Sequence, residues 1–181
     1  MSSILRVNTI TDSAGTGIPY QTGAVLQVKY YQLTTSQSVT YGSGDATIPN
    51  FQVSITPKST SSIIKLEAMV VFEANQNPHD TMFFFVKNGT KLGNTQSSPG
   101  SRRIGIAPVL ISRTSDAAQS LDQAIFTYFD APSSTSPIVY GVGINSFNAN
   151  VAFNINRTVS DANNFGSERG TSFMSATEIG G

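Results

Sequence analysis

Apolar residues recur at every second position along much of this chain, and few stretches space them at the three- and four-residue intervals of a helix. Such alternation is typical of β-strands, which turn successive side chains to opposite faces. The clearest run presents one apolar face, formed by Ile64, Leu66, Ala68, Val70 and Phe72. Lys65 and Glu67 occupy its other face, so we expect a half-buried strand here.

Other segments show strand patterns with turn signals between them. Asn88-Gly89 follows an apolar run and predicts a tight hairpin, because both residues tolerate the positive φ of a type I′ turn. The further strands are expected near residues 25–30, 51–56, 82–86, 104–111, 121–129, 138–146, 151–155 and 173–179. The sequence therefore predicts an all-β fold, a jelly-roll-like antiparallel sandwich of about nine or ten strands.

The two ends of the chain differ in pattern. Residues 1–23 are polar, Gly-rich and weakly periodic, and we expect an extended N-terminal arm there. Residues 24–181 form the expected sandwich domain. An extended arm has free backbone groups that can add a strand to a neighbouring protein, so the arm is the expected attachment segment. Its apolar residues are Ile4, Leu5, Val7 and Ile10.

Charge and cysteine content narrow the possible functions. Charged residues make up 12% of the chain, about half the usual share of about 25%, and the net charge is zero. Nothing in this balance favours nucleic acid or an anionic membrane surface as a partner. The absence of cysteine excludes disulfides and thiolate metal sites. No apolar run is long enough for a transmembrane helix, and no signal-peptide pattern begins the chain, so we expect no membrane insertion.

Residues suited to catalysis do not form a recognisable set. The single histidine, His79, lies in the turn-like sequence NPHD, and no second histidine or cysteine accompanies it. A glycosidase needs two carboxylates paired across a cleft, but the acidic residues are scattered and the chain has no tryptophan to stack a sugar. Nucleotide- and calcium-binding motifs are also missing. We therefore expect a protein that is not an enzyme and has no cofactor and no metal.

The run 82–86 is apolar on both faces. A thin sandwich buries one face of each strand, so the second face calls for a partner. Phe83 and Phe85 are accordingly candidates for a subunit interface in a closed homo-oligomer.

Arginines next to strands are conspicuous in a chain so poor in charge. They could contact a ligand or a host-surface glycan, or they could form ion pairs with carboxylates between strands or between subunits. The second interpretation is favoured. The interface candidates among these residues are Arg102, Arg103, Arg157, Arg169, Asp130 and Glu178.

Short motifs along nearly the whole chain carry a resemblance to known proteins. The start SILRVNTITD, at residues 3–12, is one of them, and KNGT at residues 87–90 is another. The others lie at residues 23–28, 54–57, 59–62, 100–103, 129–132, 156–158, 169–172 and 178–179. In their order and spacing the chain resembles small virion structural proteins of cyanophages and other marine tailed phages, which are tail-fibre, appendage or head-decoration proteins. The segment FFVKNG also looks like the trimeric C1q- and tumour-necrosis-factor-like jelly rolls.

This resemblance implies a location on the outer surface of a phage particle and no enzymatic activity. We expect a homotrimer whose arm docks on the major capsid protein or on a tail or fibre protein of the same virion. The exposed body would act as a capsid decoration or cement protein, or as a small appendage. The alternative is the tip of a tail fibre that binds host-surface glycan as a lectin-like module.

Overall fold

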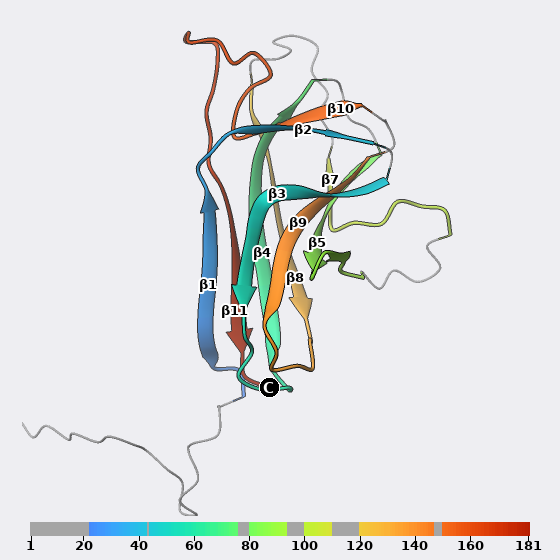
Figure 1. Ribbon diagram of the computed structural model, residues 1–181, viewed down its shortest axis with the longest axis vertical. Coiled ribbons are helices and arrows are strands. Elements are labelled where there is room, and N and C mark those ends of the chain that lie inside the picture. Colours follow the sequence, from blue (N-terminus) through green and yellow to red (C-terminus); the bar gives the residue numbers. More distant parts are fainter. Residues whose placement is uncertain (1–21, 43, 76–79, 94–99, 110–119, 147–149) are drawn as a thin grey trace, which may run out of the picture.

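The computed structural model describes residues 22–42, 44–75, 80–93, 100–109, 120–146 and 150–181. Ile4, Leu5, Val7 and Ile10 of the expected arm lie outside these residues, as does His79. The described residues contain eleven strands and no helix, arranged in two antiparallel sheets. The prediction of an all-β, jelly-roll-like sandwich is therefore confirmed (Figure 1).

The first sheet has six strands. β4 (Ile63–Ala74) lies at its centre and pairs on one side with β11 and β10, and on the other side with β8. β1 pairs with the far edge of β11, and β2 pairs with the far edge of β10. The bounds of these five partners are β1 (Val25–Leu33), β2 (Gln37–Tyr41), β8 (Asp122–Asp130), β10 (Val151–Ile155) and β11 (Ser172–Ile179).

The second sheet has five strands. β9 lies between β3 and β5, and β5 also pairs with the two short strands β6 and β7. Asn88 and Gly89 connect β5 to β6 with φ angles of 50° and 80°, so the predicted hairpin turn is confirmed. The bounds are β3 (Gly44–Ile55), β5 (Thr81–Lys87), β6 (Thr90–Lys91), β7 (Ala107–Val109) and β9 (Ile138–Ser146).

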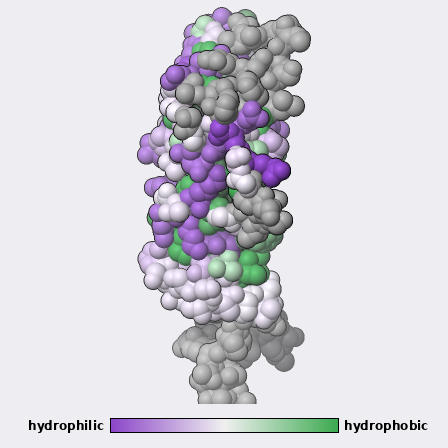
Figure 2. All heavy atoms as spheres, turned by 90° about the vertical axis from the view of Figure 1, so that its right-hand side faces the viewer, coloured by the Kyte–Doolittle hydropathy of each residue, from purple (hydrophilic) through white to green (hydrophobic). Residues whose placement is uncertain are grey.

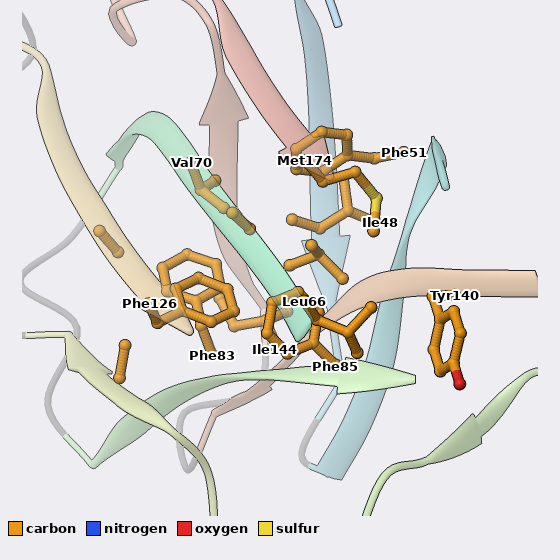
Figure 3. Close-up of a cluster of buried hydrophobic side chains, with 14 of the residues drawn as sticks. Ile48, Phe51, Leu66, Val70, Phe83, Phe85, Phe126, Tyr140, Ile144 and Met174 are labelled. Atoms are coloured by element: carbon orange, nitrogen blue, oxygen red, sulfur yellow. The ribbon is translucent and has the colours of Figure 1, made fainter. Parts of the chain in front are cut away.

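A single apolar core fills the space between the sheets. The predicted apolar face of β4 forms its middle, with every member from Ile64 to Phe72 at most 2% exposed. Phe83 packs against it from the second sheet, its ring stacked on that of Phe126 at a centroid distance of 6.0 Å (Figure 3). Phe85 lies 4.9 Å from the same ring, measured between centroids. Alternating side chains from both sheets thus interdigitate as in other β-sandwiches.

The prediction that Phe83 and Phe85 lie at a subunit interface is wrong. Both side chains are 0% exposed within the single chain, because they point from β5 into the core. No surface of either ring remains for a second subunit to contact.

The other face of β5 is covered by the same chain. Phe84 lies opposite Gly143 of β9, and Val86 lies opposite Gly141, so the missing side chains of the glycines leave room for the larger ones. The ammonium group of Lys91 sits 4.3 Å above the Phe84 ring as a cation–π contact. Phe84 is 1% exposed as a result, so both apolar faces of β5 are buried within the single chain.

Candidate interaction surfaces

The outward side of the first sheet carries large apolar side chains. We call this surface the outer face and define it by β1, β11, β4 and β8. Tyr30 is 79% exposed, Ile125 66% and Phe129 58%, and the remaining members are partly exposed. The full set is Val28, Tyr30, Met69, Ile125, Phe129 and Phe173.

The strand register joins these side chains into one surface. Met69 of β4 lies directly opposite Phe173 of β11 on one side and Ile125 of β8 on the other, which makes a three-strand apolar row. In the neighbouring rows, Lys65 and Glu67 of β4 form an ion pair with a separation of 2.8 Å. An exposed pair of this kind contributes little to stability by itself. Its importance is that the apolar face has one positive and one negative charge near its middle.

The sequence pattern predicts that the apolar side of β1 faces the core, but in the structure this side lies on the outer face. Val28 and Tyr30 lie opposite Thr177 and Ser175, whose side chains also point outward. The alternating Gln27 points inward instead and reaches the carboxylate of Glu178. The prediction of a strand is confirmed, but its apolar side faces outward in the single chain. The apolar side chains of β1 are therefore exposed to solvent in the monomer.

Glu178 is a fully buried carboxylate at the end of β11. It accepts hydrogen bonds from Gln27 Nε2 (2.5 Å), the Lys58 backbone N–H (2.6 Å) and Ser62 Oγ (2.7 Å). Burial by itself raises the pKa of this carboxyl, but the hydrogen bonds from Gln27, Ser62 and the Lys58 backbone outweigh it. The pKa of Glu178 is therefore below its usual range. Its contacts tie β1 and the loop before β4 to β11 within one chain.

We expect this carboxylate to make the protein sensitive to acid. Because the folded pKa of Glu178 is lowered, its stabilising effect is complete above the ordinary value of 4.5 and is lost as the pH falls through the lower folded pKa. Urea unfolding at neutral pH and at several acidic pH values should show a smaller slope of stability against pH in Glu178→Gln than in the wild type. Glu67→Gln, at an exposed carboxylate, is the control. Equal slopes in Glu178→Gln and the wild type would contradict the expectation.

Asp130 also has its partners inside the chain. It accepts a hydrogen bond from Tyr140 Oη at 2.5 Å and pairs with Lys87 Nζ at 2.8 Å. Burial, the hydrogen bond to Asp130 and the charge of Asp130 together raise the pKa of the Tyr140 hydroxyl. In the described part of the chain neither Asp130 nor Glu178 pairs with an arginine, so the expected arginine–carboxylate pairs between strands are wrong for these two residues, while pairs between subunits stay a prediction. Both residues fix strands of one subunit.

Arg157 and Arg169 do pair with a carboxylate. Asp161 lies 3.3 Å from Arg157 and also forms an ion pair with Arg169. The two arginines face each other across an isolated β-bridge, and Arg169 donates a further hydrogen bond to Ser36 Oγ at 2.6 Å. For these arginines the structure supports the interpretation as ion pairs between segments of the same chain.

Arg102 and Arg103 precede β7, away from the other arginines. Arg103 Nη1 donates to Asn145 Oδ1 of β9 at 2.5 Å, and both arginines line two surface cavities. Within the described residues, no group of three or more histidine and carboxylate side chains is arranged to hold a metal ion. The same part of the chain has no helix long and apolar enough to span a membrane.

Comparisons with known proteins leave the family of the chain open. No family model matches the sequence, and no curated protein matches it. Ten chains of solved structures match, among them one from a structure of infectious bursal disease virus, Gx strain. That alignment has a TM-score of 0.35 and 12% identity and covers 98% of this chain, which spans 43% of the viral chain. A TM-score of this size assigns neither a family nor a function.

Proposed function

We propose that this chain is a non-enzymatic structural protein on the outer surface of a tailed-phage particle, where it forms a homotrimer that decorates the capsid or builds a small appendage. The observation that carries the proposal is the outer face, whose exposed apolar side chains come from four strands of one sheet and include a row across three of them. Monomeric proteins rarely expose a contiguous apolar surface of this kind, and its presence marks an assembly interface. The phage setting is supported by the sequence resemblance.

A second copy of the same chain is the occupant that best fits the outer face. Lys65 and Glu67 give the face one charge of each sign, so an apolar contact between copies can also pair opposite charges. The net charge of zero also means that copies approach one another without long-range repulsion. Contacts between copies of one chain usually close into a symmetric assembly, and the resemblance to trimeric jelly rolls is the reason to expect three copies.

Ile125→Lys is expected to convert the trimer into folded monomers. Ile125 is largely exposed in the single chain, so lysine costs little there, whereas an ammonium group buried in an apolar interface without a partner is strongly unfavourable. Mass photometry would measure the oligomer, and circular dichroism the fold. Val139→Lys, at an exposed β-branched residue of the other sheet, should remain trimeric. A wild-type protein that is monomeric at micromolar concentration would refute the assembly.

A reconstruction of the intact particle tests the proposed location and separates its two forms. A decoration protein would occupy symmetry axes of the capsid, and particles without it would lose DNA on heating while still adsorbing to cells. An appendage would extend from the tail, and particles without it would keep sound capsids but adsorb poorly. Absence of the chain from purified particles would refute both forms.

A further inference from the structure

The outward side of the second sheet, opposite to the outer face, carries a row of side chains from four strands. Asp45 of β3 lies opposite Asn145 of β9, which lies opposite Met82 of β5, which in turn lies opposite Pro108 of β7. Hydrophilic residues run along the side of the molecule where β5 and β7 lie in Figure 1, as Figure 2 shows. The row passes from two polar side chains to two apolar ones.

Three surface cavities adjoin one another along this row and have wall residues in common. The first, of about 630 Å³, has Met82, Pro108 and Val109 in its wall and shares Arg102 and Arg103 with the second. The second, of about 480 Å³, shares Asp45 and Lys91 with the third, of about 790 Å³. We call this series of adjoining cavities the arginine groove. Its extent suits a chain of several rings better than a single small ion.

Glycine at position 105 brings the two arginines over the sheet. A Cβ atom at Gly105 would lie 2.9 Å from the carbonyl oxygen of Phe83 and would overlap the Met82 side chain. Because that atom is missing, the segment before β7 lies directly on β5, where the Ile106 N–H donates to the same Phe83 oxygen at 2.7 Å. Arg102 and Arg103 are held at the edge of the groove by this close approach.

Hydrogen bonds then order the polar wall. Arg103 donates to Asn145, Asn145 donates to Asp45 Oδ1, and Lys91 pairs with that same oxygen at 3.0 Å. With Arg102, the groove has three cationic side chains against the two carboxylates of Asp45 and Asp80, in a chain where only 12% of residues are charged. The local excess of positive charge favours an anionic ligand.

We propose that the arginine groove binds an acidic saccharide, a chain of sugar rings that carries carboxylate or sulfate groups. A guanidinium group has five N–H donors and matches either anion, so Arg102 and Arg103 can bind it in addition to their contacts within the chain. The second carboxylate oxygen of Asp45 offers an acceptor for a sugar hydroxyl. Met82 and Pro108 offer an apolar surface for the C–H face of a ring.

This site goes beyond the structural role, and it lies on the sheet opposite to the outer face. Assembly through the outer face therefore leaves the groove open to solvent. A particle that displays the trimer would present several grooves to a cell surface, and the linked sites would strengthen weak individual binding.

Titration calorimetry on the full chain tests the proposal. The probes are oligogalacturonate as the carboxylated saccharide, a sulfated galactan oligosaccharide, a neutral galactan oligosaccharide and inorganic sulfate. We expect one or both acidic saccharides to bind, with an affinity that falls as salt is added, and the neutral one not to bind. The stronger acidic probe identifies the anion. Absence of binding by both, equal binding of the neutral sugar, or equal binding of inorganic sulfate would overturn the proposal.

Arg102→Gln is expected to weaken binding by about tenfold or more, because a charge-assisted contact is lost. Arg102 is exposed, so the variant should fold, and Lys91→Gln provides a second variant on the other side of the groove. Lys29→Gln, at an exposed cation of β1, should bind like the wild type. Wild-type affinity in both Arg102→Gln and Lys91→Gln would overturn the proposal. The oligomer mass, unchanged in these variants, keeps this result separate from the test of assembly.

Discussion

Phe83→Ala is expected to lower the free energy of unfolding by about 3–5 kcal/mol, because it removes a fully buried ring and leaves a cavity that the sandwich cannot close. Phe83 lies between the two sheets with its centroid 5.2 Å from Phe72, 6.0 Å from Phe126 and 6.5 Å from Phe153. Rings from three other strands therefore lose contacts at once. Urea unfolding at neutral pH, followed by circular dichroism, would measure the change.

Phe165→Ala is the matched control, because the Phe165 side chain is fully exposed in a connecting segment and its loss should change stability by less than about 0.5 kcal/mol. The pair of variants also tests whether Phe83 lies in the core, as in the structure, or at a subunit interface, as the sequence pattern predicted. At an interface, Phe83→Ala would yield folded monomers of nearly wild-type monomer stability. That result would contradict the packing described above.

The regular strands could be predicted because their patterns are local. Ile64 to Phe72 alternate over the length of β4, and residues 138–146 and 151–155 coincide with β9 and β10. The turn at Asn88-Gly89 was predictable for the same reason, since positive φ is a property of those two residues. β2 and the hairpin partner β6 were not predicted. β2 is five residues long and polar at most positions, and β6 has only two residues.

Which face of a strand is covered, and by what, could not be predicted in the same way. The apolar faces of β5 are both covered by the same chain, one by the core and one by the glycines of β9, whose pairing partner is not visible in a local pattern. The face of β1 that points inward is the opposite of the one expected. Gln27 donates a hydrogen bond to Glu178 from that face, and Leu33 on the same face is buried. Alternation identifies two faces of a strand but does not say which one is inside.

The outer face was missed for a related reason, although the sequence held a signal for it. β8 is apolar on both sides, with Ala124 and Phe126 inside and Ile125 and Phe129 outside. The same two-sided pattern in β5 was attributed to a subunit contact, whereas in β8 it was not considered. The arginines are conspicuous in a charge-poor chain, but only the fold shows that Arg102 and Arg103 border surface cavities while Arg157 and Arg169 share Asp161.

Gly143→Val is expected to destabilise the protein by about 3 kcal/mol or more, since it fills the space that Phe84 occupies. A Cβ atom at this position would lie 2.6 Å from Cζ of Phe84 and 2.9 Å from the carbonyl oxygen of Ala46. The backbone oxygen of β3 has no room to retreat, so the Phe84 ring must leave its place beneath Lys91 and become exposed. Urea unfolding would measure the loss.

Gly93→Ala is the control for this substitution, because a Cβ atom at Gly93 would meet nothing within 4 Å beyond its own chain neighbours, and the φ of Gly93 is outside the left-handed region. It should be neutral or slightly stabilising. Combining Gly143→Val with Phe84→Ala should cost less than the sum of the two single effects, because the smaller side chain makes room for valine. Additive effects would mean that Gly143 does not serve to seat Phe84, and the covering of β5 by its own chain would then need another explanation.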